Sequence, residues 1–281
     1  MPQLKSKTTD KLTLNIVSLV IFIVIMFPLY WLVVTSLKPE IEIFKIPPTL
    51  FPSKIVTGSY AVQLKHGDFN MFGSFINSFI ISIGAMFISL VLAVPASYGI
   101  ARFRFKGKRF FILCFLVTQM LPVSVILTPM FILFRNVHLI NSRLSAILAD
   151  STIGIPFSVL ILKGYFASIP KELEDASCID GCNRFSTFIK IFIPIAFPGI
   201  IVCGVFSFLY GWGDLAYGMT FIQEQALRPI TAGIFNFLGQ YGTKWSYLSA
   251  FAVVTILPVI IIFVFMQKYI ISGLTSGAVK G

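Results

Sequence analysis

Four carboxylates crowd one short stretch of a chain that is otherwise strongly apolar. The stretch is Ile169–Pro198, and its acidic side chains follow a single proline: Glu172, Glu174, Asp175 and Asp180. Exposed carboxylates pair with Lys or Arg on another surface, and each such pair contributes only about 0–1 kcal/mol. These acids therefore suit the orientation of a partner, while apolar neighbours such as Ala176 and Ile179 are expected to supply the buried contact.

The same stretch carries the start and stop signals of a short helix. Pro170 suits a first helical turn, where its missing N–H is no loss, and the acids follow where the helix dipole favours negative charge. Gly181 can adopt the left-handed conformation that ends a helix. We expect a short helix, a glycine turn and a second helix with an apolar stripe: Phe185, Phe188, Ile189 and Phe192. From pattern alone, a helix that enters a partner's groove and a solvated connecting loop are equally open.

Other kinds of chemistry lack the residues that they need. Cys178 and Cys182 have i,i+4 spacing, but His66 and His138 lie far away in sequence, so we predict packing residues and no metal site. The sequence has no G-x4-G-K-[ST] phosphate loop, which excludes an ATPase of that class. Asp150 is alone among the apolar runs, which argues against a membrane-embedded enzyme.

Composition defines the class of protein. The 281 residues are 57% hydrophobic and 12% charged, with a mean hydropathy of +0.90, whereas soluble domains carry about 25% charged residues. We therefore predict an all-α polytopic membrane protein in contact with lipid. The net charge of +11 is interpreted as Lys and Arg flanking spans, and no nucleic-acid partner is predicted.

Six apolar runs are long enough to cross a bilayer, at about 20 residues per crossing. They are Leu14–Leu37, Phe72–Ala101, Phe110–Phe134, Leu144–Leu162, Ile191–Trp212 and Tyr247–Gln267. The first run is too long for the apolar part of a cleaved signal peptide, so we expect a retained span. Prolines lie inside several runs, and we expect them to kink the helices.

The distribution of basic residues predicts the orientation. With both termini on the cytoplasmic side, the inner segments hold fourteen Lys and Arg and the outer segments hold eight. The short basic loop around Arg104 and Lys108 contributes most to this bias. The acidic segment between the fourth and fifth spans is then cytoplasmic.

That segment resembles the E-A-A-x3-G-x9-I-x-L-P signature of permease subunits in binding-protein-dependent ABC importers. The matching positions are Asp175-Ala176-Ser177, Gly181 and Ile191-Phe192-Ile193-Pro194, with the spacing kept and mild replacements at Asp175, Ser177 and Ile193. The stretch "FLYGWGDLAYG" and the C-terminal "LPVIIIFVFMQKYIISGLTSGAVKG" are similar to the carbohydrate group, the maltose-type permeases. In the first of these, Gly213 replaces the usual Asn.

The resemblance implies a type I importer permease fold with a cytoplasmic coupling helix, in a bacterial cytoplasmic membrane. The chain would be one permease domain, 1–281, with its core at about 70–268, an additional span at 14–37 and a coupling segment at about 168–190. The implied partners are a second, related permease subunit, a dimer of ATP-binding cassette ATPases and an extracellular or lipid-anchored sugar-binding protein. No cofactor is implied for this chain, because ATP and magnesium would bind the ATPase. The implied coupling residues are Glu172, Glu174, Asp175, Ala176, Ile179, Asp180, Gly181 and Arg184.

Polar side chains at lipid depth are costly and often functional, which makes some residues candidates for a substrate pathway. The candidates are Asn77, Gln119, Asp150, Tyr210, Trp212, Asp214 and Tyr217. Aromatic faces beside an acid suit a carbohydrate. Interfacial aromatic belts and polar contacts between helices explain the same residues without a substrate.

Two other transport functions compete with a sugar importer. An ABC importer permease for a non-sugar solute would keep the same acidic segment. A secondary transporter usually shows inverted repeats and buried ion-pair relays, and we find neither. The sequence therefore predicts the translocation subunit of an ATP-driven importer for a sugar or oligosaccharide.

Overall fold

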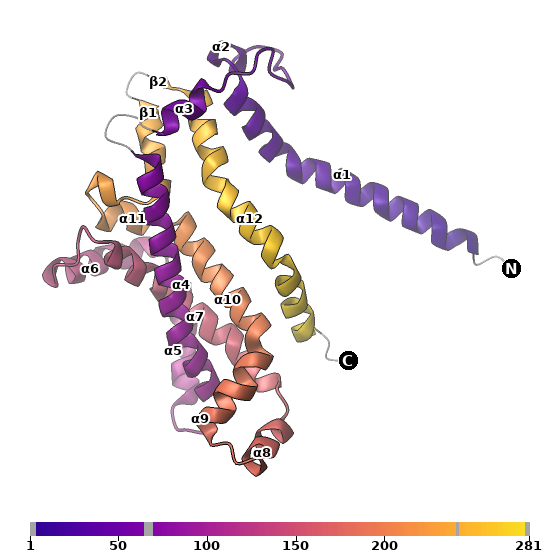
Figure 1. The fold of residues 1–281 in the computed structure, drawn as a ribbon, viewed down its shortest axis with the longest axis vertical. Helices are drawn as coiled ribbons and strands as arrows, with labels where there is room; N and C mark the ends of the chain where they lie inside the picture. The colour runs from indigo at the N-terminus through magenta and orange to yellow at the C-terminus, as the bar shows by residue number, and fades with distance from the viewer. Residues whose placement is uncertain (1–3, 65–69, 240–241, 279–281) are drawn as a thin grey trace. The chain divides into compact units, whose positions relative to one another are not determined.

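The computed structural model describes residues 4–64, 70–239 and 242–278, and it is helical almost throughout (Figure 1). Its α-helices are α1 (Leu4–Leu37), α2 (Glu40–Ile43), α3 (Gly58–Leu64), α4 (Met71–Arg102), α5 (Lys108–Met120), α6 (Val123–Asn136), α7 (Arg143–Ser168), α8 (Lys171–Ile179), α9 (Arg184–Thr187), α10 (Ile193–Gly213), α11 (Ala216–Phe221) and α12 (Trp245–Ala278). A π-helical segment, η1 (Phe188–Phe192), and 3-10 turns, η2 (Gln225–Leu227) and η3 (Ile230–Phe237), complete the helical elements. The two-residue strands β1 (Leu238–Gly239) and β2 (Gly242–Thr243) pair antiparallel.

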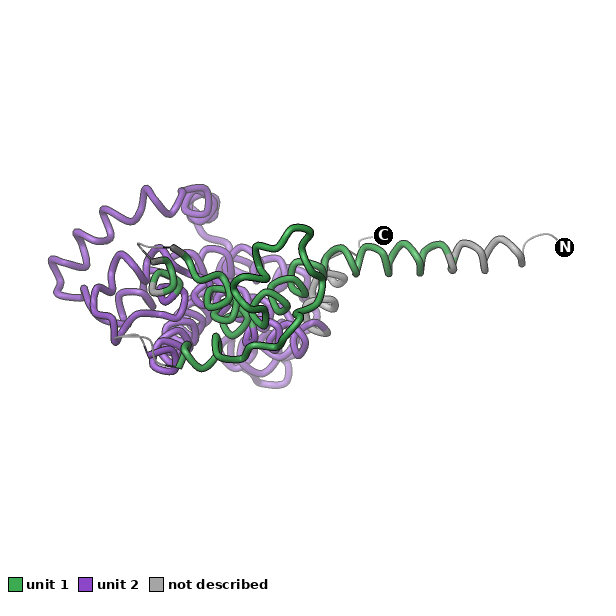
Figure 2. The backbone as a smooth tube through the Cα atoms, turned by 90° about the horizontal axis from the view of Figure 1, so that it is seen from above, with its two compact units in different colours: residues 1–67, 234–256 green, residues 68–233, 257–281 purple. Residues whose placement is uncertain are grey.

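The chain forms two compact units, shown in different colours in Figure 2. Unit 1 comprises Met1–Gly67 and Ile234–Ile256, and unit 2 comprises Asp68–Gly233 and Leu257–Gly281. Helix α12 contributes its first part to unit 1 and its second part to unit 2.

In unit 1, α1 ends in a loop that is organised around one carboxylate. Glu42 of α2 accepts hydrogen bonds from the Thr49 hydroxyl at 2.7 Å and from the Ser53 hydroxyl at 2.7 Å. The Lys38 ammonium donates to the carbonyl of Thr49. These hydrogen bonds hold the pKa of Glu42 below its ordinary value. The loop is therefore an ordered structure that depends on the ionised form of Glu42.

The beginning of α12 is held to this loop by a second carboxylate. Glu40 accepts from the backbone N–H of Trp245 at 2.8 Å and of Ser246 at 3.2 Å. These N–H groups belong to the first turn of α12, where they have no partner within the helix and where the helix dipole favours an anion. Gln63 of α3 also donates to the carbonyl of Tyr247 at 2.9 Å.

The core of unit 2 is formed by α4, α7 and α10, which pack along one another. Small residues three or four positions apart on α4 are buried: Ser74, Ser78, Ser82, Ala85, Ser89, Ala93 and Ser97. Large apolar residues of the same helix, such as Phe72, Phe87 and Leu92, are exposed. Small side chains let helix backbones approach closely in a membrane, where burying apolar surface between helices gives little advantage.

Within the described residues, five of the six predicted spans are helices long and apolar enough to cross a membrane. The third predicted span is instead divided into α5 and α6, which meet at an angle of 102°. Pro122 follows Leu121, which is extended with φ −75° and ψ 124°, because proline disfavours a helical conformation in the residue before it. The kink expected at the prolines of the run Phe110–Phe134 is therefore a sharp bend, and α5 and α6 together count as the sixth span if the bent pair crosses the membrane as one.

Candidate coupling surface and membrane pathway

The acidic segment folds as its local signals predict. Helix α8 follows Pro170, and Gly181 adopts φ +79° directly after it. Asn183 then caps α9 by accepting a hydrogen bond from the N–H of Ser186 at 2.8 Å. Figure 1 shows α8 and α9 together at one end of unit 2. The short helix, the glycine turn and the second helix are confirmed.

Most of the predicted coupling residues form an exposed surface, which we call the α8 surface. Its members are Glu172, Asp175, Ala176, Ile179, Asp180, Gly181 and Arg184. Ile179 is 88% exposed, although it is a large apolar side chain. Glu174 differs, because its side chain is only 28% exposed and faces the core of unit 2. The surface thus places acidic side chains beside the exposed apolar side chains of Ala176 and Ile179.

Behind the α8 surface, a buried pair of hydroxyls joins α8 to α9. Ser177 Oγ lies 2.8 Å from Thr187 Oγ1, and both residues are almost completely buried. Ser177 Oγ also donates to the carbonyl of Glu174 at 2.7 Å. Ser177 is one of the three departures from the signature, and here its hydroxyl holds the two helices of the segment together.

Arg102, the last residue of α4, reaches under α8. Its side chain is 6% exposed, and its Nη2 donates to the carbonyl of Ile169 at 2.7 Å. Its Nε lies 3.7 Å from Glu174 Oε2. The guanidinium also lies over the ring of Phe192, 4.5 Å from the ring centroid. One side chain of α4 thus contacts the end of α7, the acidic helix and the start of the fifth span.

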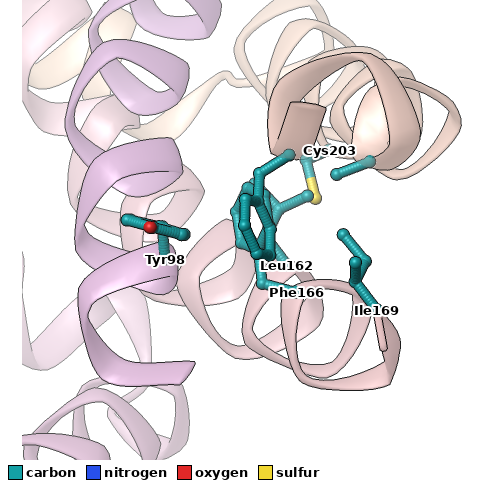
Figure 3. Packing of buried hydrophobic residues seen from close by; sticks show 7 residues of the cluster. Tyr98, Leu162, Phe166, Ile169 and Cys203 are labelled. Atoms are coloured by element: carbon teal, nitrogen blue, oxygen red, sulfur yellow. The ribbon is translucent and has the colours of Figure 1, made fainter. Parts of the chain in front are cut away.

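An aromatic cluster supports this junction inside unit 2. Tyr98 of α4 packs edge-on against Phe166 of α7 at 5.8 Å and against Phe192 of η1 at 5.0 Å, measured between ring centroids. Figure 3 places Tyr98 opposite Leu162 and Phe166, with Cys203 beyond them. Since interiors of this kind are closely packed, a displacement of η1 is transmitted to α4 and α7.

The predicted apolar stripe of the second helix divides between the core and the surface. Phe192 is completely buried and Phe188 packs against the same cluster, whereas Phe185 and Ile189 are exposed. Residues Phe188–Phe192 are π-helical, a conformation that usually occurs as a short insertion in an α-helix and often at functional sites. Arg184 lies over the ring of Phe103 at 5.3 Å, so it has a partner within its own chain.

Asn77, a predicted pathway residue, is engaged by protein groups. Its Nδ2 donates to the carbonyls of Ala226 at 2.8 Å and Arg228 at 3.1 Å. Its Oδ1 accepts from Arg143 Nε at 2.8 Å. The amide therefore ties α4 and α7 to the segment that follows α11, an arrangement that favours a structural role.

The residues around the end of α10 are also used in packing and capping. The Trp212 ring is buried against Phe75 and Phe79, with ring centroids at 5.1 and 4.9 Å. Asp214 precedes α11 by two residues and accepts from the N–H of Gly218, in the first turn of that helix, at 2.9 Å. Tyr217 is buried and stacks on Phe221, whereas Tyr210 is half-buried and stacks on Phe206.

Asp150 differs from the other candidates. It is 2% exposed on α7, and neither carboxylate oxygen has a hydrogen-bond partner among the described residues. A Cβ added at Gly211 of α10 would lie 3.2 Å from Asp150 Oδ2, so Asp150 faces the contact between α7 and α10. Gln119, in contrast, is exposed and donates to the carbonyl of Ile153 at 3.0 Å.

The described residues contain no group of three or more His, Cys, Asp or Glu side chains that could hold a metal ion. The residue that sequence reasoning missed is Arg102, behind the α8 surface. Its signal is weak, since an arginine at the end of a span is ordinary by composition. The buried contacts of Arg102 depend on segments more than sixty residues away.

Comparison with known proteins identifies the family of this chain. Residues 93–276 match the family described as binding-protein-dependent transport system inner membrane component. The chain is 33% identical to the diacetylchitobiose uptake system permease protein DasC of Streptomyces coelicolor, over 95% of this chain and 96% of that protein. It is 31% identical to the arabinooligosaccharides transport system permease protein AraQ of Halalkalibacterium halodurans, over 99% of this chain and 100% of that protein.

A solved structure shows the same fold. It is described as a bacterial ABC transporter involved in the import of the acidic polysaccharide alginate, and it matches with a TM-score of 0.78 and 19% identity, covering 94% of this chain and 97% of that chain. Together with the apolar helices, these matches confirm a multi-pass membrane protein with the importer permease fold. The chain belongs to the family of inner membrane components of binding-protein-dependent transport systems.

Proposed function

We propose that this chain is the translocation subunit of an ATP-driven importer for a sugar or oligosaccharide, and that the α8 surface docks on a separate ATPase. The observation that carries the proposal is an exposed acidic helix fixed at its base to α4, α7 and η1. A solvated connecting loop would not need a buried hydroxyl pair and a buried guanidinium to hold its direction.

The proposed mechanical step is a rigid-body movement of α8 together with the helices of unit 2. The α8 surface is rigidly joined to the helices that form the core of unit 2, so movement of a docked ATPase would rotate these helices as a body. Such rigid-body motion around a central path is the general mechanism of alternating access. We propose a cytoplasmic position for α8 and both termini, in agreement with the basic loop at Arg104 and Lys108.

A carbohydrate is the proposed cargo because the relatives named above are named for diacetylchitobiose and arabino-oligosaccharides, and another for trehalose. The remaining partners proposed are a second permease subunit and an extracellular binding protein. Asp150 is the pathway residue that the geometry favours, because no described protein group occupies its carboxylate. The other six candidates remain predictions, with their contacts in this chain favouring structural roles for Asn77, Trp212 and Asp214.

Two glycines with similar positive φ angles allow a controlled test of docking. Gly181 has φ +79° and Gly107 has φ +91°, and an added Cβ at either would meet no atom within 4 Å. Gly181→Asp and Gly107→Asp therefore carry similar backbone strain, of about 1–2 kcal/mol. Only Gly181→Asp places a new carboxylate on the α8 surface. We expect it to remain in the membrane and to abolish substrate-stimulated ATP hydrolysis by the assembled transporter, while Gly107→Asp retains it.

Two measurements complete the test. A cysteine at Ile179 is expected to cross-link to the ATPase, since that side chain is 88% exposed. Uptake of labelled diacetylchitobiose, arabinotriose and trehalose, a set that we call the sugar panel, is then compared with uptake of amino acids. Normal uptake by Gly181→Asp, or a bare Ile179 position in a working transporter, would refute docking through α8. Uptake of amino acids alone would refute the carbohydrate assignment.

A further inference from the structure

The side chain of Arg102 lies where α8, η1 and the segment between α7 and α8 meet the end of α4. It belongs to the last turn of α4, it is buried, and it lies well behind the α8 surface. It therefore cannot serve as a contact for a partner. Its contacts are all within unit 2, and each involves a different element.

The strongest of these contacts is to the backbone. Arg102 Nη2 donates to the carbonyl of Ile169 at 2.7 Å and approaches the carbonyl of Pro170 at 3.4 Å. These carbonyls follow the end of α7 and precede α8, where a helix leaves acceptors without partners in its own ladder. The charged guanidinium satisfies them, and so it fixes the point from which α8 departs.

The planar face and the remaining donor of the guanidinium contact two further elements. The face covers Phe192 in η1, with Cζ 4.5 Å from the ring centroid. Nε is buried without a hydrogen-bond acceptor among the described residues, and Glu174 Oε2 lies 3.7 Å away. A charge-assisted hydrogen bond would need about 2.9 Å. A small approach of α8 towards α4 would therefore form a direct bond at a donor that is unused in this conformation.

We propose that Arg102 is a positioning residue for coupling, which links displacement of α8 to α4 as well as to α7 and η1. This inference rests on the proposed docking of α8 on an ATPase. Without Arg102, α8 would remain connected to α10 through Thr187 and η1, but its link to α4 would be reduced to the packing of Tyr98 against η1, so α4 would follow it less closely. The expected consequence is ATP hydrolysis that is less completely converted into transport.

The replacement that tests this is Arg102→Lys. Lysine keeps the positive charge near Glu174, but it has no planar fork to bridge the carbonyl of Ile169 and no face to cover Phe192. Arg104→Lys is the matched control, because Arg104 lies two residues later in the same basic loop and is exposed. Both variants are purified as the complete transporter and placed in proteoliposomes with the binding protein.

The measurement is the number of ATP molecules hydrolysed for each molecule of panel sugar taken up. A residue that only supports folding lowers hydrolysis and uptake together, so that this ratio is unchanged for the assembled fraction. We expect Arg102→Lys to raise the ratio at least threefold and Arg104→Lys to leave it unchanged. An unchanged ratio in Arg102→Lys, in fully assembled transporter, would overturn the inference.

Two further experiments separate the possible failures. The Ile179→Cys cross-link to the ATPase is measured in the otherwise unaltered chain, and its absence there refutes the proposed docking itself. Its presence with an unchanged ratio refutes only the role of Arg102. If Arg102→Lys does not assemble, Glu174→Lys replaces it as the test. The Glu174 side chain is partly exposed, and a lysine there places a like charge beside the Arg102 guanidinium. An increased ratio in Glu174→Lys supports the inference, and an unchanged ratio contradicts it.

Discussion

Gly154 lies where α7 passes between α4 and α10, and adding one methyl group there should separate the three helices. A Cβ at position 154 would lie 2.4 Å from Ser89 Oγ of α4 and 2.8 Å from Ser207 Oγ of α10. Rotation of the hydroxyls does not solve the problem, because the Cβ of Ser89 would still be only 3.1 Å away. Gly154→Ala therefore requires a shift of the helices.

Gly164 provides the control, since it lies on the same helix and a Cβ there would meet no atom within 4 Å. Replacing a helical glycine by alanine gains up to about 1 kcal/mol in helix propensity. Overpacking costs about 1–3 kcal/mol. The propensity gain is common to both variants, so their difference in the free energy of unfolding should equal the overpacking cost, about 1–3 kcal/mol.

Thermal unfolding of the purified chain in detergent measures this difference. At roughly 2–4 °C per kcal/mol for a chain of this size, Gly154→Ala should unfold about 2–12 °C below Gly164→Ala. Gly164→Ala itself should match or slightly exceed the unaltered protein. Equal stability of the two alanine variants would show that the three helices do not meet closely at Gly154, and the arrangement of the core would then be refuted.

Three further outcomes are expected from the contacts described above. Ser177→Ala should lower the local stability of α8 and α9 by about 1 kcal/mol, because the hydrogen bond to Thr187 is lost. The expected readout is faster amide hydrogen exchange in α8 and α9, and unchanged exchange would contradict the pairing. The pKa of Glu42 is below its ordinary value of 4.5, so its bonds stabilise the loop above that pH and are lost as the pH falls through the lowered pKa. Proteolysis of the loop should therefore increase only in acid, and Glu42→Gln should remove that dependence; cleavage that is insensitive to pH would refute it. Asn77→Ala removes Asn77 Oδ1, the acceptor of the Arg143 guanidinium, and should lower the free energy of unfolding by about 2 kcal/mol. The sugar concentration for half-maximal uptake should not change. A change in that concentration would favour a substrate contact.

The sequence was informative where structure is determined by neighbouring residues. Pro170 and Gly181 bound a helix of nine residues, and both act through backbone conformations that do not depend on the rest of the fold. The five uninterrupted spans were also predictable, because a bilayer requires long apolar helices.

The rest depends on contacts between distant segments. Pro122 was identifiable as a disturbance, but whether it kinks a span or ends a helix is decided by the helices around it. The pattern on α4 was harder to interpret, because the buried face carries serine and alanine whereas the exposed face carries phenylalanine and leucine. A search for the most apolar face would have chosen the wrong side of this helix.

Two of the three departures from the signature, Asp175 and Ser177, are not equivalent in the structure. Asp175 keeps its charge and is exposed, so it retains the role of an acid on the α8 surface. Ser177 stands where the signature has alanine. It is buried, and its hydroxyl is paired with that of Thr187 at 2.8 Å, so this replacement affects packing inside the segment and not its exposed surface. In the proposed docking, the apolar contact would fall to Ala176 and Ile179, which are exposed. The segment thus has two faces: one is exposed, and we propose that it meets the ATPase, while the other is fixed to the spans by Ser177 and by Arg102 beneath Glu174.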